Sequence, residues 1–83
     1  MVKEENWAAD IRRIRAFFRE QPDVTEEQDS FRFRDCRISL TEWKTKDERM
    51  WATNRTVIRM EGSNENVEMI YHRFFLRFLS AGG

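Results

Sequence analysis

Residues 4–19 repeat their apolar positions with the spacing of an amphipathic helix. Trp7, Ile11, Ile14 and Phe18 follow one another at intervals of four, three and four residues. This spacing places them on one stripe of a helix, with polar side chains on the remaining faces. The pattern therefore predicts a first helix from Glu4 to Arg19.

An acidic segment follows this helix. Pro22 is expected to end the helix, because its ring removes a backbone donor and restricts the preceding residue. The sequence "PDVTEEQDS" then has the composition of a polar connector. Thr25 and Gln28 have the spacing of a capping box, which allows a single helical turn within the connector.

Two later segments, residues 31–43 and 55–60, are rich in β-branched and aromatic residues and are predicted to be strands. The apolar phase of the first slips by one residue around Arg34 and Asp35. A bulge, or a short break between two strands, would absorb this slip. The apolar residues that show the slip are Phe31 and Phe33 before it, and Cys36, Ile38 and Leu40 after it.

The polar segment "KTKDER" separates these strands and predicts an antiparallel hairpin. A register that places Trp43 opposite Trp51 would place Arg37 opposite Val57, all on one face. Sliding the pairing by one residue would instead send Trp51 and Val57 to the other face.

The last periodic segment predicts a second helix. Ser63, Asn64 and Glu65 offer N-cap chemistry and an early acidic residue, and the helix is expected to continue to about Leu79, before "AGG". The predicted core face contains Val67, Ile70, Tyr71, Phe74, Phe75 and Phe78.

These elements predict a single α+β domain over residues 1–83. The expected architecture has two layers, with two helices packed on one face of a small antiparallel sheet. The expected order is helix, strand, strand, helix, and a bulged first strand would supply a third short strand.

Composition narrows the class of protein. The chain has 83 residues, of which 40% are hydrophobic, and one cysteine. Small secreted domains usually need disulfides, so a cytoplasmic location is expected. The chain also lacks a long apolar run and a signal-peptide pattern, and neither export nor membrane insertion is expected.

The chemistry-bearing residues do not predict an enzyme. Cys36 and His72 are the single cysteine and histidine, and a cysteine that alternates with aliphatic residues is usually an inert small hydrophobe. His72 is predicted near the polar side of its helix. With no nucleotide-binding motif and no pair of metal-ligand spacings, we expect no catalytic residue, metal, cofactor or small-molecule substrate.

The formal net charge is zero, but it is unevenly distributed. Residues 1–30 carry −3, residues 31–60 carry +4 and residues 61–83 carry −1. Strand alternation sends the central arginines to the sheet face opposite the helices. Arginine beside tryptophan is suited to single-stranded nucleic acid, with guanidinium groups at phosphates and bases stacked on indole rings. The residues of this candidate surface are Arg32, Arg34, Arg37, Trp43, Trp51, Arg55 and Arg59.

Protein binding is the other hypothesis, and the one that the sequence favours. Phe17, Met69 and Leu76 exceed what two helices on a small sheet readily bury, and they are candidate interface residues. A two-stranded sheet is also rarely stable alone, so edge pairing between two copies would form a homodimer. Alternatively, the first helix packs on Met69 and Leu76 and leaves no apolar surplus.

Overall fold

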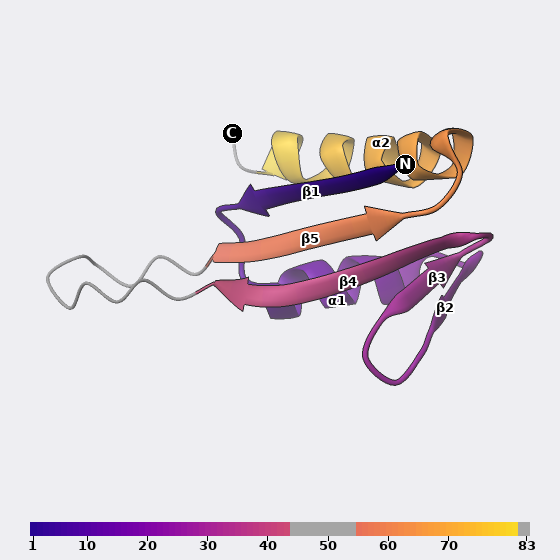
Figure 1. Ribbon diagram of the computed structural model, residues 1–83. Coiled ribbons are helices and arrows are strands. Elements are labelled where there is room, and N and C mark those ends of the chain that lie inside the picture. Colours follow the sequence, from indigo (N-terminus) through magenta and orange to yellow (C-terminus); the bar gives the residue numbers. More distant parts are fainter. Residues whose placement is uncertain (44–54, 82–83) are drawn as a thin grey trace, which may run out of the picture.

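The computed structural model describes residues 1–43 and 55–81, with side chains as far as Leu79. The described strands form one antiparallel sheet in the order β1-β5-β4-β3-β2 (Figure 1). Along the chain the elements are β1 (Val2–Trp7), α1 (Ile11–Glu20), β2 (Val24–Glu26), β3 (Phe31–Phe33), β4 (Cys36–Trp43), β5 (Arg55–Glu61) and α2 (Asn64–Ala81).

The α+β class is confirmed, whereas the predicted order of elements is wrong. Residues 2–7 form strand β1 rather than the first turns of a helix. Strand β1 pairs with β5 over six residues, and the ring of Trp7 packs against Phe74 and Phe75 of α2 at centroid distances of 5.0 and 5.9 Å. Long-range pairing thus overrides the weak β propensity of the local sequence.

Helix α1 begins at Ile11 because Asp10 caps it. The Asp10 carboxylate accepts a hydrogen bond from the backbone N–H of Arg12 at 2.8 Å, and the Arg12 side chain also donates to it. These bonds, first of all those of the Arg12 side chain, lower the pKa of Asp10 to about 2. The helix ends at Glu20, just before Pro22, as expected.

The acidic connector contains strand β2 rather than a helical turn. The phase slip that follows marks a chain reversal between β3 and β4, where Phe33 pairs with Cys36. Arg34 has a φ of 56° in this two-residue turn, a left-handed conformation that is strained for a residue with a side chain. The short break between two strands, one of the two alternatives considered, is therefore what the chain adopts.

The β4–β5 hairpin has a different register from the one predicted. Trp43 lies opposite Arg55, and Arg37 lies opposite Glu61. The pairing is displaced by four residues from the expected Trp43–Trp51 register, and Trp51 and the predicted turn lie outside the described residues. Because four is an even number, each side chain still points to the face that was expected.

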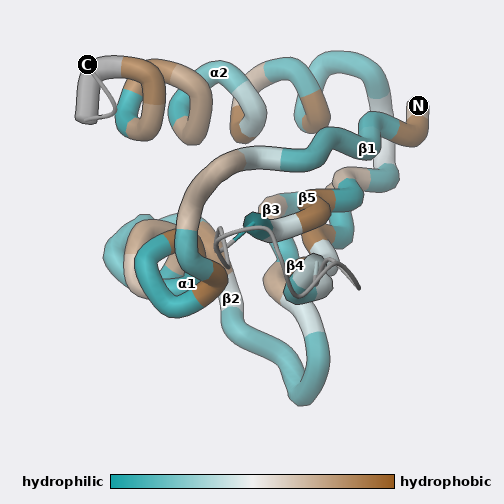
Figure 2. Tube along the Cα trace, turned by 90° about the vertical axis from the view of Figure 1, so that its left-hand side faces the viewer, coloured by the Kyte–Doolittle hydropathy of each residue, from teal (hydrophilic) through white to brown (hydrophobic). Residues whose placement is uncertain are grey.

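The core lies between the sheet and both helices. Its buried side chains come from α1 (Ile14, Phe17, Phe18), β3 (Phe31, Phe33), β4 (Cys36, Ile38), β5 (Ile58, Met60) and α2 (Val67, Ile70, Phe74), together with Ala9. The expected two-layer packing, with both helices on one face of a small sheet, is wrong. Helix α2 runs along the β1 edge, whereas α1 lies beside β2 and β4 (Figures 1 and 2). Aromatic rings of the two helices meet in the space between them.

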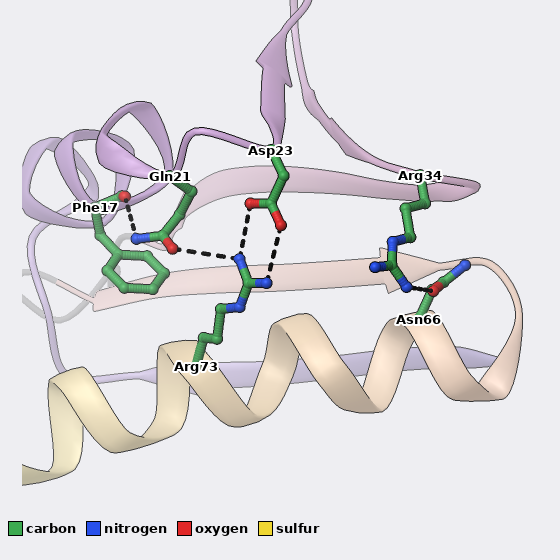
Figure 3. Close-up of polar contacts among 6 residues, drawn as sticks. All are labelled: Phe17, Gln21, Asp23, Arg34, Asn66 and Arg73. Atoms are coloured by element: carbon green, nitrogen blue, oxygen red, sulfur yellow. Dashed lines mark hydrogen bonds and ion pairs between the residues drawn. The ribbon is translucent and has the colours of Figure 1, made fainter.

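A polar cluster at the protein surface joins α2 to the segment after α1. Both oxygens of Asp23 accept hydrogen bonds from the Arg73 guanidinium, at 2.8 and 2.9 Å (Figure 3). The same guanidinium donates to the Gln21 side chain at 3.5 Å and lies 5.1 Å from the centroid of the Phe33 ring. The hydrogen bond from Arg73 is the main cause of the lowered pKa of Asp23.

Candidate binding surface

The sheet face that points away from the helices, here called the outer face, is polar and mostly exposed. Its composition follows from strand alternation and from the register, since directly paired residues share a face. Within the described part of the chain it consists of Val2, Glu4, Asn6, Thr25, Arg32, Arg37, Ser39, Thr41, Trp43, Arg55, Val57, Arg59 and Glu61.

Two arginines lie directly opposite each other on this face. Arg32 of β3 pairs with Arg37 of β4, and Glu61 is the neighbour of Arg37 on the other side. Arg32 donates to Glu27 at 3.3 Å, whereas the Arg37 guanidinium forms no ion pair with the described residues. Like charges placed opposite each other destabilise a sheet, so this pair favours an anion between the two side chains.

The remaining arginines of the outer face have partners. Arg59 lies between Glu4 and Glu61, with nitrogen–oxygen distances of 3.8 Å to each. Its side chain is 50% exposed, and ion pairs of this length and exposure add little stability. Arg55 donates to the side-chain oxygen of Asn6 at 2.8 Å.

Trp43 lies at the other end of strand β4 and is 40% exposed. Ser39 and Thr41 are the outward residues between Arg37 and Trp43. Since two residues of a strand advance about 6.6 to 6.8 Å, the row from Arg37 to Trp43 spans about 20 Å. From Arg37 to Trp43, the row therefore presents a guanidinium group, two hydroxyl groups and an indole ring.

One predicted member does not lie on the outer face. The Arg34 guanidinium is 5.1 Å from the centroid of the Phe33 ring and donates to Asn66 of α2 at 3.3 Å, which places it on the helical side of the sheet (Figure 3). The turn conformation at Arg34 explains the difference, because strand alternation does not continue through a reversal. A second predicted member, Trp51, lies outside the described residues.

Sequence reasoning missed the acidic residues of the outer face. Glu4 was assigned to a helix, and Glu61 lies one residue beyond the predicted strand. The capping residue Asp10 was the available signal, since it indicates that the helix begins only after residue 10. Both glutamates reduce the positive charge that the sequence predicted for this face.

No family model, curated protein or solved structure matches this chain.

The predicted interface residues occupy three different environments. Phe17 is 5% exposed and belongs to the core, so little of its side chain is available to a partner. Met69 is half-buried and packs against the core. Leu76 is 53% exposed on α2, and Leu79, one turn further, is 56% exposed.

The two candidate residues for nucleophilic chemistry lie in different surroundings. Cys36 is buried on the helical side of the sheet, and its burial raises the pKa of the thiol. His72 is exposed on α2. Among the described residues, no group of three His, Cys, Asp or Glu side chains could hold a metal ion. In the same residues, no helix has the length and apolar character needed to cross a bilayer.

Proposed function

We propose that this protein is a non-enzymatic binding module and that its outer face binds single-stranded nucleic acid. The observation that carries the proposal is Arg37, which has no ion-pair partner among residues 1–43 and 55–79. It lies opposite a second arginine, on a strand that ends in an exposed tryptophan. Phosphates are the anions that planar guanidinium pairs bind well. Every base offers a face for stacking on an indole ring.

In the proposed complex the nucleic acid lies along β4. Its phosphates lie at Arg37 and Arg32, and a base stacks on Trp43. Arg55 contributes further positive charge beside the neutral Asn6, whereas the charge of Arg59 is offset by Glu4 and Glu61. Ser39 and Thr41 donate hydrogen bonds to sugar or base oxygens between the two ends. The contact is polar, in keeping with a face that has few apolar residues besides Trp43.

The test is fluorescence anisotropy of labelled oligouridine and oligothymidine at low salt. Trp43→Ala should weaken binding by roughly tenfold, because stacking contributes about 1 to 3 kcal/mol per base. Arg37→Ala should weaken binding and reduce the slope of log K against log salt by about 0.7, the value for one contact to a single strand.

Arg12→Ala is the matched control. Arg12 belongs to α1, on the other side of the sheet, and its side chain is 84% exposed. The substitution removes the same charge and should leave affinity unchanged. Equal losses in the Arg12 and Arg37 variants, or no binding of either oligonucleotide at low salt, would refute the proposal.

Self-association is a second candidate function, favoured by the exposure of Leu76 and Leu79. The edge-pairing argument no longer supports it, because the described residues of one chain already form a five-stranded sheet. Edge strand β1 carries Lys3 and Glu4, and edge strand β2 has three residues, both features that discourage edge pairing. The proposed dimer therefore uses α2, and Leu76→Lys should convert it to a monomer in light scattering.

We also propose a reducing, cytoplasmic setting. The support is chemical, since the one cysteine of the chain is a buried free thiol.

A further inference from the structure

A hollow lies between the two helices, on the opposite side of the sheet from the outer face. It has a volume of about 190 Å³ and is lined by residues of α1 and of the last turns of α2. This hollow, here called the interhelical notch, is lined by Arg13, Ala16, Phe17, Glu20, Arg77 and Phe78.

The floor of the notch is apolar. The rings of Phe17 and Phe78 meet edge to face, with centroids 5.8 Å apart and an interplanar angle of 77°. This contact joins the helices and leaves part of Phe78 uncovered, since that residue is only half-buried. Ala16, the residue of α1 beside the rings, has too small a side chain to fill the space above them.

The rim of the notch is charged. The Arg13 guanidinium lies 5.9 Å from the centroid of the Phe78 ring. On the α2 side, Arg77 faces Glu20 at a nitrogen–oxygen distance of 3.7 Å, with both side chains more than half exposed. The rim therefore holds two cations and one anion, and its exposed ion pair can exchange partners at little cost.

The volume of the notch and the charge of its rim together indicate the kind of ligand. The volume is below the range of about 300 to 1,000 Å³ that is typical of sites for small molecules and cofactors. It suits a single side chain of leucine or phenylalanine size. The net positive rim favours a carboxylate next to that side chain, where Arg13 or Arg77 would bind it.

We propose that the interhelical notch docks an acidic peptide segment of a partner protein, with one large apolar side chain inserted between α1 and α2. The carboxylates that flank this side chain pair with Arg13 and Arg77. This site is separate from the outer face, and it does not depend on nucleic-acid binding.

The experiment uses synthetic acidic peptides that carry a central Leu, Phe, Ala or Lys, titrated into the ¹⁵N-labelled full chain. The Leu and Phe peptides should shift the amide signals of Ala16 and Phe78. The Ala peptide should bind roughly tenfold more weakly, because it loses the buried apolar surface. Equal affinity of the Ala and Leu peptides would overturn the proposal, as would shifts confined to the outer face.

Two substitutions test the site itself. Ala16→Leu fills the notch with a good helix former at an exposed position, and it should abolish binding while the amide spectrum stays folded. Arg13→Glu reverses a rim charge and should weaken binding, whereas Arg12→Glu, its neighbour on α1, should have little effect. Retained binding by Ala16→Leu would refute the proposal. Binding of an oligonucleotide in the notch, in place of the peptides, would also refute the proposal.

Discussion

The phenol of Tyr71 donates a hydrogen bond of 2.6 Å to the Glu5 carboxylate, joining the middle of α2 to edge strand β1. Trp7 donates to the same carboxylate oxygen at 3.1 Å. Burial raises the pKa of Glu5, but the bonds from Tyr71 and Trp7, with the nearby Lys3, lower it by more in total. The contact therefore depends on an ionised Glu5 and a protonated Tyr71.

The first prediction concerns the titration of Tyr71, the single tyrosine of the chain. Burial and the bond to Glu5 raise its pKa to about 12, above the ordinary value of 10.0. Since the folded value is raised, the contribution to stability is complete below pH 10 and disappears as the pH rises through 12. Ultraviolet absorbance should show ionisation near pH 12 in the folded protein.

Glu5→Gln is the control for this prediction. The substitution removes the charge that Tyr71 faces but leaves the phenol buried. The pKa of Tyr71 should therefore fall toward 10 without reaching it. A wild-type midpoint near 10 would show that the Tyr71–Glu5 contact is absent in solution.

The second prediction concerns the strained turn residue Arg34. Arg34→Gly should leave the protein more stable than Arg34→Ala by about 1 kcal/mol, because glycine adopts a positive φ without steric cost. Arg34→Ala retains the strain and loses the contacts with Phe33 and Asn66, so it should destabilise. Urea unfolding measures both variants. Equal shifts of the two midpoints would contradict the left-handed conformation.

The third prediction concerns Gly62, which connects β5 to α2. A Cβ atom at this position would lie 2.8 Å from the Cα of Cys36 and 2.9 Å from the carbonyl oxygen of Asp35. Gly62→Ala should therefore cost about 1 to 3 kcal/mol, because backbone must move. Thermal unfolding measures the loss. Faster hydrogen exchange at the start of α2 should accompany it, and an unchanged melting temperature would contradict the close approach.

The fourth prediction concerns the ion pair between Arg73 and Asp23. Their side chains are 35% and 41% exposed. Solvent therefore screens the attraction, even though two hydrogen bonds join the guanidinium to the carboxylate. A double-mutant cycle with Arg73→Ala and Asp23→Ala should give a coupling free energy of about 0.2 to 1 kcal/mol, smaller at high salt. A much larger, salt-independent coupling would show that the pair is more buried than the structure indicates.

Part of the fold could be predicted because local pattern and tertiary packing agree there. The last helix was predicted to open within residues 63–65 and to continue to about Leu79, and it is observed at Asn64–Ala81. The residues predicted for its core face are buried or half-buried. The faces of Arg32, Arg37, Trp43, Arg55 and Arg59 were also predicted correctly. Strand alternation fixes a face locally, and an even displacement of the register does not change it.

Only the tertiary structure decided the rest, because those features depend on contacts distant in sequence. Residues 2–7 form a strand because β5 is available to pair with them. That same pairing brings Glu4 beside Arg59 and reduces the charge of the outer face. The interhelical notch exists because α1 and α2, more than forty residues apart in the chain, meet at Phe17 and Phe78. Periodicity within one element determines which side chains share a face, but the neighbours of that face are determined by the packing of the whole chain.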